Sequence, residues 1–486
     1  MRRFWTLALA ACAVLSFAAV WLGGINQDEG WYLYAANLVA EGKMPYRDFF
    51  YTQGPLMPIV YSAFAWIWGA WGLLGARIFT LALGLAGVAM AAATAKRLAP
   101  EGRGGAAAAA AFLLLGCNLY HIYYVAMPKT YALAGLFVCT AFYLLSFLAG
   151  ESPRRAWTFA AGAGVLLAFA AGTRISLGAM LPVVGVWLLA SRRWRALVWF
   201  CAGAGIGLAL VYGPFLADPK AFAGLVAAQG YHAARGGSDV VWTVGSLSRL
   251  VRWYLPVFVM LGLGWSYARA VPADARVRRG FAGAMFASAA VVFAVQMLAP
   301  FPYEDYQVPV MGLVAAYAAA YAVRFDKGVL LALGMAFACS FGSPLLEKWS
   351  TNGQDRFWSI KKQKYELAQL RDVAAEIEAL DPGGRDILTQ DLYLAIETRR
   401  RVPAGLEMGP FSMLDDASWR KLLESAPCAV AALSGYTFAV DPPVCSERPV
   451  DVQMQYWEIL KKRYELVRSE NYFGQNSTPL LLLRRK

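Results

Sequence analysis

Residues 1–29 read MRRFWTLALAACAVLSFAAVWLGGINQDE. Two arginines precede an apolar run from about Phe4 to Gly24, and the acidic pair Asp28 and Glu29 follows it closely. A run of about 20 apolar residues is long enough to cross a bilayer as a helix. A signal peptide has a similar pattern, but many apolar runs come later in the chain. They favour an uncleaved first span with the N-terminus inside.

The rest of the chain is similarly apolar. Of its 486 residues, 59% are hydrophobic and only 16% are charged, and the mean hydropathy is +0.44. Soluble domains carry about 25% charged residues, which excludes a single soluble domain, a disordered chain and a fibrous protein. We predict an all-α polytopic membrane domain of eleven spans. After the first, the spans lie near residues 76–95, 104–119, 128–149, 156–172, 176–190, 196–216, 251–268, 281–299, 307–323 and 328–343.

The net charge of +13 belongs to the apolar part of the chain. Residues 1–343 contain 25 Lys and Arg against 12 Asp and Glu, whereas residues 344–486 contain 20 of each. Basic clusters recur in alternate loops, as the positive-inside rule expects of cytoplasmic loops. Nucleic-acid binding would need a basic patch on a soluble face, and none is visible. The clusters are Arg2/Arg3, Lys96/Arg97/Arg103, Arg154/Arg155, Arg192/Arg193/Arg195, Arg269/Arg276/Arg278/Arg279 and Arg324/Lys327.

Residues 55–71, PLMPIVYSAFAWIWGAW, are also apolar enough to span. If they did, every later basic cluster would lie on the outer side, against the charge rule. We therefore predict an interfacial or re-entrant helix at 55–71 within the first outer loop, residues 25–75, because Trp is enriched at membrane interfaces. With eleven spans, the N-terminus is cytoplasmic and the C-terminal part is external.

Residues 344–486 are predicted to form a small extracytoplasmic α/β domain. The segment KKQKYELAQLRDVAAEIEAL at 361–380 has the apolar spacing of an amphipathic helix, and DPGG ends it. The short apolar runs DILTQ, CAVAAL and PLLLLR follow, with helical stretches near 416–425 and 451–463. Cys428 and Cys445 are either a disulfide or two free thiols.

The chemistry is expected on the outer side. The chain has two histidines, no Walker A loop and no GxGxxG motif after a strand, which disfavours a serine–histidine triad, a His-rich metal site and nucleotide chemistry. Asp28 and Glu29 lie at the membrane boundary, where a carboxylate can accept a proton from a hydroxyl. The alternative is that the pair only caps the following helix.

Basic and aromatic residues near outer span ends are candidate ligands for a lipid phosphate. Lys129 and Arg174 lie there, and an arginine can bind phosphate through two hydrogen bonds. The alternative is that both side chains extend to the phosphates of ordinary membrane lipids. Further candidates come from the loop 217–250 and from PYEDYQVPV, where an aromatic belt is an equal explanation for the tyrosines. These are His232, Arg235, Tyr303 and Tyr306. The acids of PYEDYQVPV, Glu304 and Asp305, either bind sugar hydroxyls or are simply solvated.

The order of these motifs resembles the C-type (GT-C) membrane glycosyltransferases, which use polyprenyl-phosphate sugars. That superfamily includes the protein O-mannosyltransferases and the lipid A aminoarabinose transferases. The resemblance covers about residues 1–343 in architecture, and short motifs carry it. They are Asp28 and Glu29 with Tyr32 and Ala35, GKMPYRDF at 42–49, GPL at 54–56, GAR at 75–77, PKTYALAGLF at 128–137 with Tyr131, and YEDYQVPV at 303–310.

The resemblance implies inverting transfer of a sugar from a polyprenyl-phosphate-linked donor to a hydroxyl of a glycan, lipid or protein acceptor. The reaction would take place at the outer face of a bacterial inner membrane. Asp28 would be the general base and Glu29 would orient Asp28 or the acceptor. Lys129 and Arg174 would neutralise the departing phosphate. No cofactor is firmly implied, and a divalent metal is an option that the sequence leaves open.

One motif departs from the family pattern. The aminoarabinose transferases carry Glu-Lys before the proline pair that opens the interfacial helix, whereas this chain has Gln53 and Gly54. Asp48 lies nearby as a substitute acid. A transporter or flippase and an envelope-assembly scaffold are the alternative classes. A transporter would normally show mid-span charges or paired broken helices, which are not seen, and the acid pair favours the enzyme.

Overall fold

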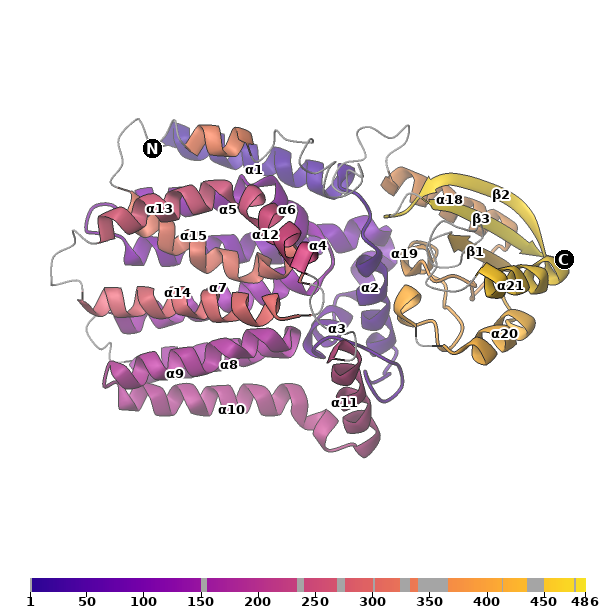
Figure 1. Cartoon of the computed structure of the whole chain (residues 1–486), viewed down its shortest axis with the longest axis horizontal. Coiled ribbons are helices and arrows are strands. Elements are labelled where there is room, and N and C mark those ends of the chain that lie inside the picture. The colour runs from indigo at the N-terminus through magenta and orange to yellow at the C-terminus, as the bar shows by residue number, and fades with distance from the viewer. Residues whose placement is uncertain are drawn as a thin grey trace.

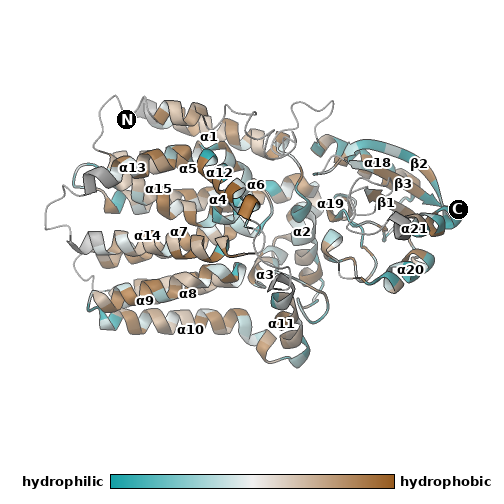
Figure 2. Cartoon of the chain, viewed as in Figure 1, coloured by the Kyte–Doolittle hydropathy of each residue, from teal (hydrophilic) through white to brown (hydrophobic). Residues whose placement is uncertain are grey.

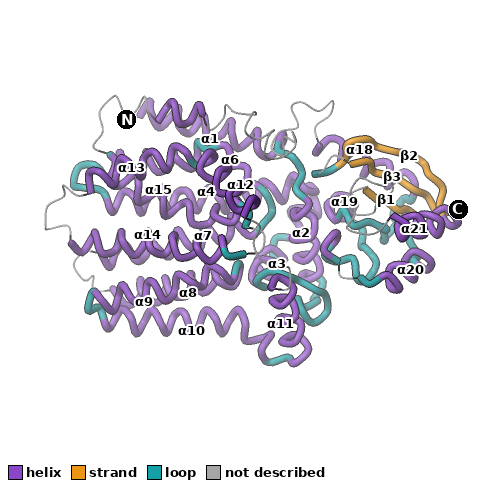
Figure 3. Tube along the Cα trace, in the orientation of Figure 1, coloured by secondary structure: helices purple, strands orange, loops and turns teal. Residues whose placement is uncertain are grey.

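The structure is a computed structural model of the chain. It describes residues 2–149, 155–233, 240–268, 276–299, 302–323, 333–339, 366–412, 414–434, 450–475 and 478–486. A bundle of long helices forms one end of the molecule, and a smaller domain with a three-stranded sheet forms the other (Figures 1 and 3). The N-terminus lies at the end of the bundle farthest from this C-terminal domain (Figure 1).

The bundle is apolar along its length (Figure 2), as a membrane domain requires. Among the described residues, six helices are long and apolar enough to cross a bilayer, and the number rises to eight if each of two bent pairs is one span. The six helices are α1 (Arg2–Leu22), α4 (Ala65–Leu98), α7 (Thr130–Ser146, extended by a 3-10 turn, η1, Phe147–Ala149), α8 (Ala156–Thr173), α10 (Trp194–Leu216) and α14 (Arg276–Met297).

Two pairs of helices are sharply bent. The helices α5 (Gly104–Gly116) and α6 (Leu119–Ala126) meet at 68°, and α12 (Val240–Trp253) and α13 (Leu255–Ala268) meet at 77°. The helices α9 (Met180–Ala190, after the 3-10 turn η2, Ile175–Ala179) and α15 (Val308–Ala322) are short, since 15 residues extend only about 22 Å. Residues 328–343 lie largely outside the described residues. The predicted total of eleven spans is therefore not confirmed.

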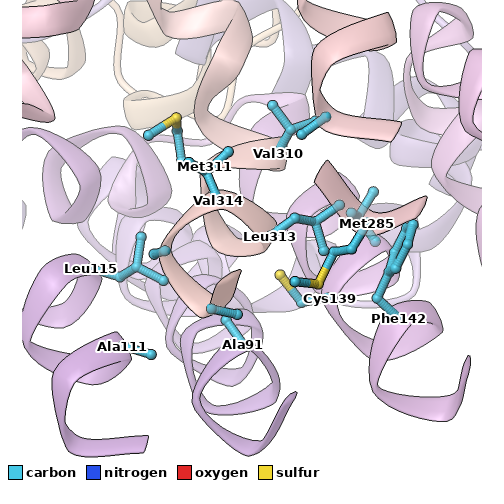
Figure 4. Packing of buried hydrophobic residues seen from close by; sticks show 14 of the residues in the cluster. Ala91, Ala111, Leu115, Cys139, Phe142, Met285, Val310, Met311, Leu313 and Val314 are labelled. Carbon is cyan, nitrogen blue, oxygen red and sulfur yellow. The ribbon is translucent and has the colours of Figure 1, made fainter. Parts of the chain in front are cut away.

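Small residues let the helices pack closely. A Cβ atom at Gly164 of α8 would lie 2.2 Å from the Phe200 carbonyl oxygen of α10, so only glycine fits this contact. Nearer the centre, α15 packs among α4, α5, α7 and α14, and its Leu313 lies beside Met285 of α14 (Figure 4). This rigid core fixes the helix ends from which the functional side chains project.

The first outer loop forms a layer across one end of the bundle. The helix α2 (Gln27–Ala40) runs across the bundle axis, near α3 (Leu56–Ser62) and α11 (Pro219–Ala233) (Figure 1). Helix α4 contains a break at Gly72, whose φ of 61° and ψ of −152° are not helical. Residues 55–71 therefore form α3, a turn and a short bent-off segment. Their interfacial placement stays a prediction.

The C-terminal domain has the predicted mixed composition. Its helices are α18 (Glu366–Leu380), α19 (Leu392–Glu397), α20 (Asp416–Ser425) and α21 (Val450–Arg463). The strands β1 (Val430–Ser434), β2 (Tyr464–Phe473) and β3 (Thr478–Arg485) form an antiparallel sheet in the order β1–β3–β2. The predicted helix at 361–380 is confirmed over the range of α18, and CAVAAL and PLLLLR form β1 and β3. DILTQ makes only isolated bridges. Cys445 lies outside the described residues, so its pairing with buried Cys428 is not tested.

The C-terminal domain is docked closely on α2. A Cβ atom at Gly30 would lie 2.4 Å from the backbone nitrogen of Tyr393 in α19. Two glutamates of the domain also accept hydrogen bonds from backbone nitrogens of the first outer loop and of α4. Glu366 accepts a 2.5 Å hydrogen bond from the Ile25 nitrogen, and Glu397 accepts one of 2.8 Å from the Leu73 nitrogen, just after the break in α4. The start of α2 is thus clamped between the bundle and the C-terminal domain.

Candidate functional site

The first turn of α2 presents Asp28. Asn26 caps this helix: its side chain accepts a hydrogen bond from the Asp28 nitrogen, and an acid in the first turn is favoured by the helix dipole. One carboxylate oxygen of Asp28 accepts a 3.1 Å hydrogen bond from the Trp31 indole, and the other lies 2.8 Å from Lys129 Nζ. The side chain keeps 27% of its surface exposed, so a ligand can reach it.

Lys129 precedes α7 in extended backbone and is buried. Its ammonium lies 2.8 Å from Asp28 and 3.2 Å from Asp305. Burial by itself would lower the pKa of Lys129, but the negative charges of Asp28 and Asp305 raise it well above its ordinary value. Lys129 is therefore a fixed cation between two carboxylates from distant parts of the sequence.

Asp305 lies in the 3-10 turn η4 (Glu304–Gln307) that leads into α15. Its Oδ2 accepts hydrogen bonds from Lys129 and, at 2.9 Å, from the Tyr131 hydroxyl. Its Oδ1 is buried and has no hydrogen-bond partner in the described part of the chain. Buried carboxylate oxygens are normally satisfied, so this atom is suited to accept a hydrogen bond from a ligand.

Arg174 ends α8 and is also buried. Its guanidinium carbon lies 4.5 Å from the centre of the Tyr306 ring and 5.2 Å from that of Tyr131, which are cation–π distances. Among the described residues, its one hydrogen bond to a side chain is long, 3.4 Å from Nη1 to Thr130 Oγ1, and its Nε has no partner. No described carboxylate lies within ion-pair distance of this guanidinium. A buried cation without a counter-charge is costly, so this position favours a bound anion.

We call these residues the polar cluster: Asp28, Lys129, Tyr131, Arg174, Asp305 and Tyr306. It combines one accessible carboxylate with two buried cations. The cluster can accept a proton at Asp28 and bind an anionic group at Arg174 and Lys129.

Glu29 lies outside the cluster, although it is next to Asp28. Its side chain is fully buried, and both oxygens accept hydrogen bonds of 2.6 and 2.7 Å from Arg77 of α4. The same guanidinium donates to the carbonyls of Val20, Gly23 and Gly24 at the end of α1. Glu29 also accepts a hydrogen bond from the Asn26 nitrogen. This arrangement joins α1, α2 and α4 and leaves no face of Glu29 for a substrate.

The other predicted residues are not gathered at the cluster, with one exception. Tyr303 lies beside it, 5.5 Å from Tyr306 between ring centres. Asp48 is paired with Arg47 at 2.8 Å on the surface, and the Arg47 hydrogen bond lowers the pKa of Asp48 to about 2. Arg235 lies outside the described residues, as does the side chain of His232, whose backbone is in α11.

The sequence places Asp305 and Glu304 at the outer end of a span, but it predicts neither the contact of Asp305 with Lys129 nor the neighbouring ion pair. Glu304 lies 2.9 Å from Arg249 of α12, beside the cluster. The available signal was the position of both acids in YEDYQVPV at the outer end of a span, where desolvated acids need partners. The described residues contain no group of three or more His, Cys, Asp or Glu side chains able to hold a metal ion. We therefore derive no step through a metal.

No known protein family and no curated protein matches the chain at the level of sequence. Solved structures do match. ArnT from Cupriavidus metallidurans bound to undecaprenyl phosphate aligns with a TM-score of 0.62 and 15% identity, over 98% of this chain and 97% of that one. AglB from Archaeoglobus fulgidus, an archaeal oligosaccharyltransferase in complex with an inhibitory peptide and a dolichol-phosphate, aligns with a TM-score of 0.51 and 10% identity, over 89% and 70%.

The arabinofuranosyltransferase AftD from mycobacteria aligns with a TM-score of 0.50 and 14% identity, over all of this chain and 40% of that one. All three are GT-C glycosyltransferases, so the predicted resemblance is confirmed at the level of the fold. The likeness to ArnT extends through the C-terminal domain, since it covers nearly the whole of both chains.

Proposed function

We propose that this chain, a multi-pass membrane protein with the GT-C fold, is a glycosyltransferase that uses a polyprenyl-phosphate-linked sugar. The acceptor is a hydroxyl of a glycan, lipid or protein at the outer face of a bacterial inner membrane. The proposal joins two independent supports, the fold and the polar cluster. Two of the solved structures with this fold contain a polyprenyl-type lipid phosphate, undecaprenyl phosphate or dolichol-phosphate.

The observation that carries the proposal is that Arg174 is a buried cation whose surroundings lack a counter-charge among the described residues. Its guanidinium is buried, lies within cation–π distance of two tyrosine rings and has no carboxylate partner among the described residues. A lipid phosphate would supply the missing charge, and the planar guanidinium can donate two parallel hydrogen bonds to it. Lys129 also lies close to Tyr131, with its Nζ 5.3 Å from the ring centre, and can neutralise the same phosphate.

In the proposed reaction, the acceptor oxygen forms a bond to the anomeric carbon while the bond from that carbon to the phosphate oxygen breaks. Attack opposite the leaving group inverts the anomeric configuration. Asp28 takes the acceptor proton, and the polyprenyl phosphate leaves with the bonding electron pair. Arg174 and Lys129 stabilise the charge that develops on that phosphate.

Lys129 has a second role in this scheme. With the site empty, Lys129 is ion-paired to one carboxylate oxygen of Asp28, so that oxygen is already occupied. An arriving phosphate would compete for the Lys129 ammonium and loosen that pair. Asp305 keeps Lys129 in place during the exchange, because it binds the ammonium from another element. The donor is therefore expected to bind before the acceptor loses its proton.

We assign Glu29 to the framework rather than to the chemistry. The sequence suggested that Glu29 orients the acceptor or Asp28, but its contacts are with Arg77 and the backbone of Asn26. It still contributes to the site indirectly, because it fixes the first turn of α2, from which Asp28 projects.

The proposal is tested by comparing glycolipids and glycoproteins of wild-type and deletion cells by mass spectrometry. Complementation with the wild-type chain should restore one missing glycoform, and Asp28→Asn should not. Purified protein should then bind undecaprenyl phosphate and transfer the identified sugar from its polyprenyl-phosphate form. If lipid-linked sugar moves between leaflets but no glycoform depends on the chain, the protein is a flippase and the proposal fails.

A further inference from the structure

A second polar cavity lies between the bundle and the C-terminal domain. This interdomain cleft has a volume of about 910 Å³. Its walls come from the second half of α2, the bent-off start of α4, the helices α18 and α19, and the loop after α19. Figure 1 shows these elements meeting at the junction of the two parts.

The cleft is separate from the polar cluster. It is lined by Asn37 of α2 and by Glu41, the residue directly after that helix, whereas the cluster uses Asp28 in the first turn of α2. Asn37 follows Asp28 by about 2.5 helical turns, which turns it to the opposite side of α2 and moves it about 13 Å along the axis. A ligand in the cleft therefore does not occupy the proposed site of sugar transfer.

The lining is rich in arginine. Five arginines and three glutamates face the cleft. Three of the arginines are neutralised: Arg371 by Glu397 at 3.3 Å, Arg401 by Glu41 at 3.2 Å, and Arg400 by Glu378 and Asp381.

The remaining two, Arg385 and Arg399, have no carboxylate within ion-pair distance among the residues that the structure describes. The one hydrogen bond of the Arg399 side chain is a long one, 3.4 Å to the Ala70 carbonyl oxygen. Five arginines against these four carboxylates leave the cleft with an excess of one positive charge, and Arg385 and Arg399 are the arginines free to bind an anion.

Arg400 shows that the cleft wall has a defined conformation rather than consisting of loose surface side chains. Its side chain is fully buried, with two carboxylates and the Asp381 carbonyl around its terminal nitrogens. Its Nε is a buried donor with no partner in the described residues. Arg399, directly before it, has a φ of 56°, a left-handed conformation that points the chain back toward α4. An oxygen-rich ligand in the cleft would satisfy the exposed Arg399.

The position of the cleft favours a ligand at the membrane surface. The α4 segment that forms one wall also exposes Trp66 and Trp71, and exposed Trp at a span end is typical of the headgroup layer. The excess charge and the available donors suit phosphate, since guanidinium groups bind it through paired hydrogen bonds.

We propose that the interdomain cleft is an anion site in which Arg385 and Arg399 bind the phosphate of a lipid headgroup. The site stands on the cleft alone and does not depend on the proposed sugar transfer. A soluble phosphorylated glycan presents the same chemistry, so the experiment distinguishes the two sources.

Full-length protein in neutral detergent is titrated with inorganic pyrophosphate by calorimetry, and phosphatidylglycerol is compared with phosphatidylcholine by native mass spectrometry. The double variant Arg385→Gln/Arg399→Gln should bind the anions about tenfold more weakly or worse, because each lost arginine removes charge-assisted hydrogen bonds. Its melting temperature should stay close to that of the wild type, because both side chains are exposed.

The matched control is Arg420→Gln/Arg484→Gln. It removes the same charge from the same domain at surface positions outside the cleft. Equal weakening by the two double variants would overturn the proposal, as would the absence of anion binding by the wild type. If Arg174→Ala loses anion binding and the cleft double variant keeps it, the anion binds in the polar cluster, and the proposed cleft site is also overturned. Binding of pyrophosphate but not phosphatidylglycerol would support the phosphate site and reject the lipid source.

Discussion

Two adjacent acids, Asp28 and Glu29, have different environments because the helix turns by about 100° per residue. Asp28 faces Lys129 and a partly open space, whereas Glu29 faces the interior and Arg77. The first prediction concerns Asp28→Asn, which keeps the size of the side chain and removes the base. We expect a normal fold and a sugar-transfer rate roughly 10²- to 10⁴-fold lower. The measurement is turnover with purified, normally folded protein, and near-normal turnover would remove Asp28 from the chemistry.

Glu29→Gln should act on stability instead. The variant would leave the Arg77 guanidinium buried without its counter-charge, and breaking a buried ion pair from one side costs about 3–5 kcal/mol. We expect a large loss in melting temperature in detergent, with activity falling only as folded protein is lost. Exposed Asp48→Asn is the control and should change stability by less than about 1 kcal/mol. A Glu29→Gln protein that melts like the wild type and is inactive would return Glu29 to the catalytic role.

Arg174 is the residue at which phosphate binding is most sharply tested. Arg174→Ala removes charge and shape, whereas Arg174→Lys keeps the charge and loses the planar fork. We expect undecaprenyl phosphate affinity to fall most in Arg174→Ala and to be partly retained in Arg174→Lys. Because Arg174→Ala removes a buried cation without a carboxylate partner, the lipid-free variant should be at least as stable as the lipid-free wild type. Unchanged lipid affinity in Arg174→Ala would contradict the assignment.

At the scale of elements, the placement of Asp28 depends on the contact between α2 and α19. Gly30 makes that contact possible, because any side chain there would meet the Tyr393 backbone at 2.4 Å. We predict that Gly30→Ala destabilises the protein by about 1–3 kcal/mol, since overpacking forces the elements apart. The readouts are thermal unfolding and sugar transfer, both of which should fall.

The control for this prediction is Gly69→Ala in the exposed start of α4. A Cβ atom at Gly69 meets nothing within 4 Å, and alanine is the better helix former. Its stability should therefore be unchanged or higher by up to about 1 kcal/mol. Equal effects of the two substitutions would show that the close approach of α19 to α2 has no energetic consequence.

At the scale of the whole molecule, the N-terminus and the C-terminal domain lie at opposite ends of the bundle (Figure 1). This arrangement is the one that a cytoplasmic N-terminus and an external C-terminal domain require. We predict that a reporter fused at Gly102, beside the basic residues that end α4, gives a cytoplasmic signal, and that one fused after Lys486 gives an external signal. An external signal at Gly102 would reverse the orientation and move the polar cluster to the cytoplasmic side.

Much of this architecture could be predicted from the sequence because hydropathy, helical spacing and charge bias are properties of short segments. They identified the apolar helices, α18, α20, α21 and two of the three strands. They were less able to count spans, since α9 and α15 are shorter than a full crossing and α5–α6 and α12–α13 are bent. β2 was missed because its charged and exposed residues lack a clear apolar alternation.

The sequence by itself determined that Asp28, Glu29, Lys129 and Arg174 lie near span ends, because this follows from where apolar runs stop. Only the tertiary structure decided which of them meet. Lys129 and Asp305 are 176 residues apart in the chain, yet they share a hydrogen bond, and the same lysine pairs with Asp28. The tertiary structure also decided that Glu29 pairs with Arg77 and that Asp48 pairs with Arg47 on the surface. The physical reason is that ion pairing is set by the packing of whole helices against one another, and no local pattern encodes that packing.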